Sequence, residues 1–313
     1  KKRLRTTFHR TFALSRDQIR QLLDAAARVE EVNPVNRNCL TAEAIRSQTQ
    51  LGTVQVEAMP RYSRACGLLD ERLCLTPFGQ TVFDRDPLLE TPTTQWLMHY
   101  HISAAHGVGP PFWSQTVTSL FKAGDEISHS QVAAYISKVV AETEGRELTE
   151  RDARSTATVF LGTYTSAEAL AQLGILEELT DNRYLVQEPD PPSPWVFGLA
   201  LLDYWRAAYG ENRLTINLDD LSAPGALGDI FLIGPGRINR TLARLQDEGF
   251  VEVYRLAPPY QVVLRQTDPA PLLEKLYALD ADADDRRGHR RPARAALPRA
   301  HRAVADPARG GRP

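Results

Sequence analysis

One sequence pattern recurs three times in this chain and limits the folds that it can adopt. In each copy a polar, helix-forming stretch ends at a glycine, and two apolar residues, an acidic residue and a short strand-like segment follow. The three junctions are Gly67-Leu68-Leu69-Asp70, Gly174-Ile175-Leu176-Glu177 and Gly249-Phe250-Val251-Glu252. A glycine supplies the left-handed conformation that ends a helix, and the apolar pair then turns the chain under that helix into a β-hairpin. The pattern predicts a mostly helical α+β protein built from tandem winged helix-turn-helix units with small β-hairpin wings.

The third copy is the best formed of the three. Pro235 stands where proline favours the first turn of a helix, and apolar residues follow it at helical spacing. Two strand-like segments, 251–254 and 260–264, flank a turn at Pro258-Pro259 and predict a wing. Three arginines at helical spacing are predicted to contact DNA phosphates: Arg237, Arg240 and Arg244.

The first copy predicts a helix over 41–50, a second helix over 53–66 and a strand over 73–76. The second helix carries Arg61 and Arg64, a further pair of predicted DNA contacts. For each arginine cluster the alternative is a solvent-exposed helix face without a ligand. The elements expected for the second copy are helices over 128–144 and from residue 149, and a hairpin over 179–186.

The composition changes near residue 281. From 281 to 313 there are nine Arg and four Asp, a net charge of +5, so a total of -2 over 313 residues leaves -7 on the first 280. We expect a disordered basic tail that either meets nucleic acid without specificity or has no role. The expected divisions are 1–85 with the first winged helix, 86–190 as a central helical region with the second, 191–280 as the C-terminal winged helix, and 281–313 as the tail.

Several classes of protein find no support in the sequence. The chain has no Walker-type phosphate loop, no dinucleotide-binding glycine motif after a strand and no Gly-x-Ser-x-Gly elbow. No apolar run approaches the roughly 18 to 20 residues that span a bilayer. Cys39, Cys66 and Cys74 have no zinc-ligand spacing and are expected to be buried thiols. These features predict a cytoplasmic protein without a membrane partner.

The segment 84–101 suggests a different chemistry, because it holds three carboxylates and two histidines within 18 residues. Thr91-Pro92 predicts the start of a helix, on which histidines two positions apart point to different sides. Asp84, Asp86 and Glu90 precede that helix and could hold Mg²⁺ or a similar divalent cation through carboxylate oxygens. The alternative is structural: Asp86 begins a turn, Glu90 favours the helix N-terminus and the aromatic residues form core.

The same segment carries a resemblance to a known family. The motifs are Asp86-Pro87-x-Leu89-Glu90, Thr94-x-Trp96-Leu97-x-His99-Tyr100, Phe112-Trp113, Leu120-Phe121 and the stretch 7–14. They resemble a bacterial family known as a domain of unknown function, whose proteins occur beside cysteine desulfurases in DNA phosphorothioation clusters. The resemblance covers about residues 6–265. It implies DNA binding and strand nicking in the service of sulfur insertion, with a cysteine desulfurase, an ATPase and a sulfur-transfer enzyme as partners.

The sequence hypothesis is therefore a metal-dependent DNA nickase of a phosphorothioate modification system. Asp86 and Glu90 would hold the metal and His99 would act as general acid or base, so these three are the predicted catalytic residues. One alternative is a winged-helix DNA-binding regulator or scaffold that retains DNA without nicking it. Another is an assembly adaptor for sulfur-transfer enzymes that does neither, and the acidic body keeps it open because negative charge weakens non-specific DNA affinity.

Overall fold

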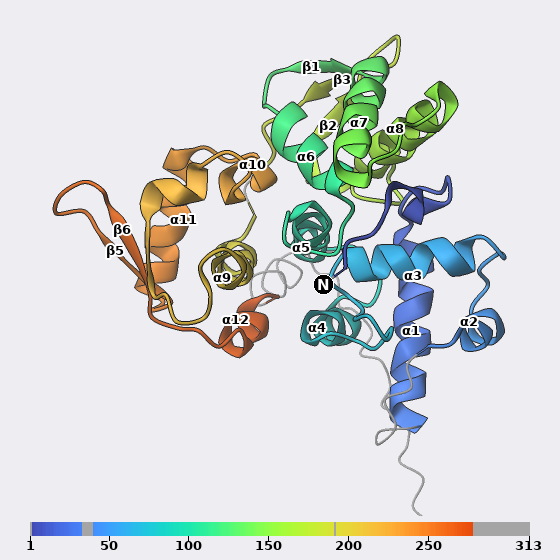
Figure 1. Cartoon of the computed structure of the whole chain (residues 1–313). Helices are drawn as coiled ribbons and strands as arrows, with labels where there is room; N and C mark the ends of the chain where they lie inside the picture. The colour runs from blue at the N-terminus through green and yellow to red at the C-terminus, as the bar shows by residue number, and fades with distance from the viewer. Residues whose placement is uncertain (1, 33–39, 191, 278–313) are drawn as a thin grey trace, which may run out of the picture. The chain divides into compact units, whose positions relative to one another are not determined.

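The computed structural model describes residues 2–32, 40–190 and 192–277, which fall within one compact unit, Lys1–Ala278 (Figure 1). The described residues are mostly helical and form two small three-stranded antiparallel sheets, which confirms the predicted α+β class. The expected divisions at 85/86 and 190/191 stay predictions. The expected tail at 281–313 lies outside the described residues.

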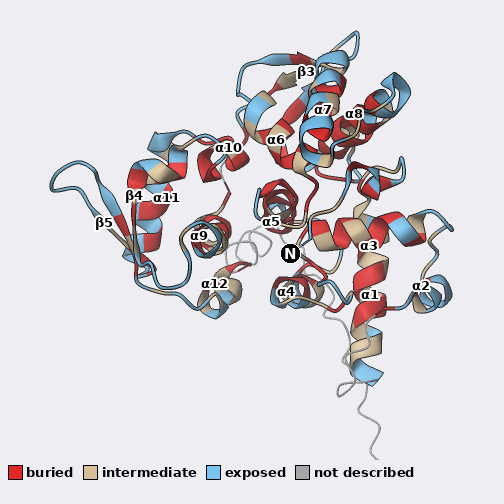
Figure 2. Ribbon diagram, in the orientation of Figure 1, coloured by how far each residue is buried: buried red, intermediate tan, exposed pale blue. Residues whose placement is uncertain are grey.

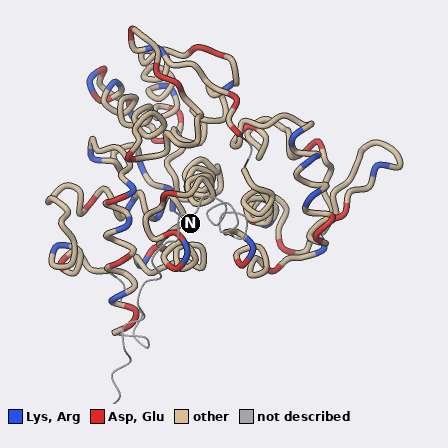
Figure 3. Tube along the Cα trace, turned by 180° about the vertical axis from the view of Figure 1, so that it is seen from behind, with Lys and Arg blue, Asp and Glu red and all other residues tan. Residues whose placement is uncertain are grey.

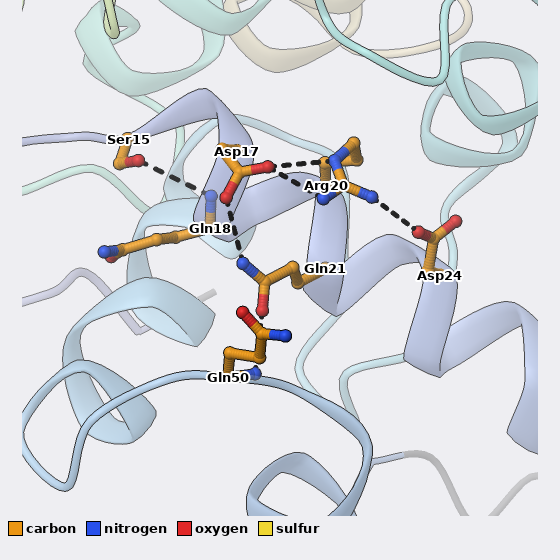
Figure 4. Close-up of polar contacts among 7 residues, drawn as sticks. All are labelled: Ser15, Asp17, Gln18, Arg20, Gln21, Asp24 and Gln50. Atoms are coloured by element: carbon orange, nitrogen blue, oxygen red, sulfur yellow. Dashed lines mark hydrogen bonds and ion pairs between the residues drawn. The ribbon is translucent and has the colours of Figure 1, made fainter.

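The first third of the chain is helical. Its elements are η1 (Thr6–His9), α1 (Arg16–Val32), α2 (Ala42–Gln48), α3 (Gln55–Ala65) and α4 (Pro77–Arg85). The two helices predicted for the first copy are therefore present as α2 and α3. Side-chain hydrogen bonds run along α1, where Arg20 donates to Asp17 and Asp24 (Figure 4). The Gln21 side-chain oxygen also accepts a hydrogen bond from the backbone amide of Gln50. The last of these bonds fastens α1 to the loop that follows α2.

The strand predicted over 73–76 is wrong. Between Gly67 and Thr76 the backbone forms one isolated bridge, from Leu69 to Leu75, in place of a strand. The reason is local, because the Asp70 carboxylate accepts hydrogen bonds from the amides of Arg72 (2.8 Å) and Cys74 (2.9 Å). These bonds close a tight turn where a strand would need extended backbone.

Helix α5 (Pro92–Ser103) is buried on nearly all sides. It packs against α3, α6 (Pro111–Leu120), α9 (Pro194–Tyr209) and α10 (Leu227–Phe231). Figure 2 shows α5 as a largely buried ribbon and α9 as a ribbon of buried, intermediate and exposed residues. The predicted start is confirmed, since the Thr91 hydroxyl accepts from the Thr94 amide and proline occupies the first turn.

Two later segments repeat one order of elements, namely helix, strand, two helices and two strands. The first has α6, β1 (Glu126–Ser128), α7 (His129–Glu144), α8 (Glu150–Thr165), η2 (Ala171–Leu173), β2 (Leu176–Glu178) and β3 (Arg183–Val186). The second has α9, β4 (Thr215–Asn217), η3 (Leu218–Ser222), α10, α11 (Pro235–Asp247), β5 (Val251–Tyr254) and β6 (Gln261–Leu264), and α12 (Ala270–Lys275) follows it. In both sheets the third strand lies between the first two, with orders β1-β3-β2 and β4-β6-β5. The hairpin predicted after Gly249 is thus present, and the one predicted over 179–186 is present with its first strand earlier, at Leu176–Glu178.

The cysteines differ from one another in state. Cys66 is a buried free thiol, as predicted. Cys74 is disulfide-bonded, so the prediction of three thiols is wrong there, and Cys39 lies outside the described residues. None of the helices in the described ranges has the length and apolar character needed to cross a bilayer.

Candidate functional site

A pocket of about 620 Å³ opens where α3, α4, α5 and α9 approach one another. Its size falls in the range of small-molecule and substrate sites. Leucines of α5 and α9 form part of the wall, together with other apolar and small residues and a set of charged or titratable side chains. These side chains are Lys2, Arg64, Asp70, Glu71, His101, His106, Asp203 and Arg206.

Three of the polar groups in and beside this pocket form a hydrogen-bonded cluster. The Nε2 atom of His106 lies 2.8 Å from Oδ2 of Asp203, and the Tyr100 hydroxyl donates to the same oxygen over 3.0 Å. Burial alone would raise the pKa of Asp203, but the hydrogen bond with His106, the charge of His101 and the Tyr100 hydroxyl outweigh it and hold the pKa at about 2. Asp203 is therefore an anion at neutral pH.

The backbone fixes this cluster in place. Tyr100 is fully buried, and its ring stacks on Phe231 with centroids 5.9 Å apart. The loop that carries His106 folds tightly onto the end of α5, since a Cβ at Gly109 would lie 2.1 Å from the Ile102 carbonyl oxygen. The amide of Leu4 also donates to Val108 in this loop, over 2.9 Å.

A glycine forms the wall behind the His101 ring. Gly67, the glycine that follows α3, has a φ of +75°. A Cβ on this residue would lie 2.5 Å from Cδ2 of His101. Gly67 therefore meets two requirements, a left-handed backbone and close approach of an imidazole ring.

The structure places Asp86 in a helix-capping role. Its side chain is fully buried; Oδ1 accepts from the Glu90 amide (3.1 Å), and Oδ2 accepts from the Thr91 amide (3.0 Å), the Thr91 hydroxyl (2.8 Å) and the Thr94 hydroxyl (2.6 Å). Because the Thr94 proton points to Asp86, the Tyr277 hydroxyl at 2.7 Å donates to Thr94. This network links the loop before α5 to the segment after α12.

This arrangement does not fit a magnesium site. Mg²⁺ needs oxygen lone pairs facing the ion and room for its waters, whereas both Asp86 oxygens are occupied by donors. Glu90 is exposed and reaches Asp86 through its backbone amide. Within the described ranges no group of three or more His, Cys, Asp or Glu side chains could hold a metal ion. The geometry corresponds to the capping alternative, and a metal role for the pair stays a prediction.

His99 belongs to a buried network. Its Nε2 must donate to the Ile230 carbonyl oxygen (2.7 Å), so Nδ1 accepts from the Tyr164 hydroxyl (3.0 Å), which in turn accepts from Trp113 Nε1 (2.9 Å). Burial lowers the pKa of His99 to about 4. A neutral ring with both nitrogens engaged holds α5 against α6, α8 and α10, and lies away from the pocket that His101 lines.

The predicted DNA-binding arginines have unequal surroundings. Arg237 is 26% exposed, pairs with Glu188 (3.0 Å) and donates to the Pro189 carbonyl oxygen (2.8 Å). Arg240 and Arg244 are exposed on α11, and the charge view of Figure 3 shows basic segments along this helix. The two arginines of α3 have different surroundings. A guanidinium nitrogen of Arg61 lies 3.8 Å from a carboxylate oxygen of Glu57, whereas Arg64 lines the pocket.

Comparison with known proteins gives the family. A family model described as "Protein of unknown function (DUF4007)" matches residues 7–277. The chain belongs to the DUF4007 family. Comparison with curated proteins finds no match.

This DUF4007 chain is similar in structure to two crystal structures of SspB. Magnesium ion-bound SspB has a TM-score of 0.67 and 18% sequence identity, with 90% of this chain and 89% of the SspB chain covered. The second SspB structure has a TM-score of 0.66 and 17% identity over the same shares. The resemblance that the sequence motifs suggested is confirmed for the family and, at these identities, for the fold.

Sequence reasoning missed the main polar cluster of this DUF4007 protein. His106 and Asp203 are 97 positions apart, so no local spacing relates them. One signal was available: a separation of two positions predicts that His99 and His101 face different sides of α5. The structure confirms that difference, and it is His101, not His99, that lines the pocket.

Proposed function

We propose that this DUF4007 protein binds DNA and nicks one strand as part of a DNA phosphorothioate modification system. The observation that carries the proposal is the similarity of fold to SspB over about nine-tenths of both chains. The motifs between residues 86 and 121 support it independently, because the family resemblance that they carry implies strand nicking for sulfur insertion. Its partners would be DNA and the cysteine desulfurase, ATPase and sulfur-transfer enzyme of the same system.

The two segments with repeated element order, 111–186 and 194–264, would be winged helices. Support comes from their common order of elements and from the placement of the third strand between the first two. In the second segment α11 would enter a DNA groove and the β5–β6 hairpin would serve as the wing. Arg240 and Arg244 would contact phosphates from the exposed face of α11.

Magnesium is the proposed cofactor. SspB has been crystallised with a magnesium ion, which motivates the choice. Since the loop at Asp86 does not fit the ion as it stands, a metal at Asp86 and Glu90 would require this loop to open. The dependence on Mg²⁺ is tested directly by chelation.

The test incubates supercoiled plasmid with the full-length protein and Mg²⁺, with and without EDTA, beside a gel-shift assay on the same DNA. Open-circular product that disappears with EDTA is expected. Retention of DNA without open-circular product would replace nicking by the regulator or scaffold alternative. Neither retention nor product would leave the adaptor role and refute the DNA proposal.

A further inference from the structure

The polar cluster in the pocket has the arrangement of a histidine prepared to accept a proton. The Asp203 carboxylate only accepts hydrogen bonds, so Nε2 of His106 carries the ring proton in the 2.8 Å contact. In the neutral ring the lone pair then sits on Nδ1. None of the hydrogen bonds among the described residues occupies Nδ1, and 27% of the side-chain surface is exposed.

The hydrogen bond between Nε2 and Asp203 orients the ring of His106. Asp203 receives a second hydrogen bond, from Tyr100, so its oxygen cannot move without breaking a bond made by a fully buried residue. The backbone of the loop that carries His106 lies close to the end of α5, since a Cβ at Gly109 would lie 2.1 Å from the Ile102 carbonyl oxygen. A carboxylate that fixes the tautomer and orientation of an imidazole also stabilises the imidazolium that forms when the ring takes a proton.

The same pocket carries groups that suit a phosphate. Lys2, Arg64 and Arg206 line it together with His101. Of the acidic lining residues, Asp70 and Glu71 lie in the turn that follows α3, and Asp203 lies on α9. A pocket lined both by cationic side chains and by an imidazole with an available nitrogen can hold a phosphodiester and remove a proton from the attacking water.

We propose that this pocket binds the DNA phosphodiester that is cut and that His106 is the general base, with Asp203 and Tyr100 as positioning residues. The inference rests on the proposed nicking function and places its chemistry away from Asp86. Nδ1 takes a proton from water as the water oxygen bonds to phosphorus. The bond from phosphorus to one deoxyribose oxygen breaks, and that oxygen takes a proton from solvent. The imidazolium returns its proton to solvent, so no oxidant, reductant or further reactant is needed.

The experiment measures single-turnover nicking of supercoiled plasmid and DNA affinity for the full-length wild type, His106→Ala and Asp203→Asn. His129→Ala is the matched control, because His129 is a partly exposed histidine that bonds to Thr158, outside the pocket. His106→Ala should lose about 10² to 10⁴ in rate with unchanged DNA affinity. Added imidazole should restore part of this loss, which a purely structural role would not allow.

Asp203→Asn tests the positioning role. The Asn amide can donate to Nε2, which moves the ring proton to Nδ1 and removes the base, so the rate should fall while DNA affinity stays unchanged. Wild-type nicking by His106→Ala, or a loss that imidazole does not restore, would overturn the inference and leave the proposed function standing. Absence of nicking by the wild type would overturn both the proposed nicking function and the role of His106. The two failures are therefore distinguishable by the activity of the wild type.

Discussion

Replacing Asp86 by Asn separates the capping role from the metal role, because the two predict different changes in stability. As a buried cap, the carboxylate accepts four hydrogen bonds from Glu90, Thr91 and Thr94. As an exchangeable metal ligand, it would lose charge at little structural cost. Asn occupies nearly the same volume, so the difference between the two roles lies in donors and acceptors.

The magnitude follows from the geometry. An Asn side chain has one acceptor oxygen and one donor NH₂, so in its better orientation the NH₂ faces the Glu90 amide and one bond is lost. The other three bonds, to Thr91 and Thr94, lose their charge assistance, at roughly 1 kcal/mol each. With the unsatisfied donor added, Asp86→Asn should lower the free energy of unfolding by about 3 to 5 kcal/mol.

Urea unfolding followed by circular dichroism measures this difference, with Glu90→Gln as the matched control. Glu90 is exposed, so its substitution should change the free energy of unfolding by no more than about 0.5 kcal/mol. If Asp86→Asn proves as stable as Glu90→Gln while plasmid nicking disappears, the capping argument is refuted and the metal role gains support.

Three further outcomes are expected. The pKa of His99 is about 4 in the folded protein and about 6.5 when unfolded. The free energy of unfolding should therefore fall by up to about 3 kcal/mol as the pH is lowered through that interval. His99→Gln should flatten this pH dependence in urea melts. Replacing Arg240 and Arg244 together by Ala should weaken DNA binding and reduce the log-log salt slope by about 2, whereas Arg237→Ala should mainly lower stability; equal salt slopes for all proteins would contradict the phosphate assignment. Trp96→Ala should lower the free energy of unfolding by about 3 to 5 kcal/mol, since its 4% exposed ring packs against buried aromatic rings, and a loss below 1 kcal/mol in thermal or urea melts would show that the site is not well packed.

Sequence reasoning succeeded where a few neighbouring residues determine the local structure. Thr91 begins α5 and Pro235 lies in the first turn of α11 because caps and proline act within a single helical turn. The glycines at 174 and 249 likewise end their helical segments in the left-handed conformation. The strand over 73–76 failed for an equally local reason, a turn closed by Asp70, which apolar patterning does not reveal.

The candidate site was harder to predict because the same residue types serve different purposes. An aspartate before a helix can be a metal ligand or a cap, and the four donors around Asp86 distinguish the two roles. His99 lies on the same helix as the pocket residue His101, but both nitrogens of its ring are hydrogen-bonded, one to Tyr164 and the other to Ile230. The contact between His106 and Asp203 arises from the packing of α9 beside α5, which no motif within the chain encodes.

The three glycines at the helix–hairpin junctions differ in how well they should tolerate substitution. At Gly174 and Gly249 an added Cβ would meet nothing within 4 Å, so only the left-handed backbone resists substitution, and Asn, which adopts that conformation more readily than other residues, is an acceptable replacement. At Gly67 the same change would also drive a carbon into the His101 ring. The three glycines look equivalent in the sequence, but only at Gly67 would a side chain deform the pocket. We therefore expect functional variants to keep glycine at this position.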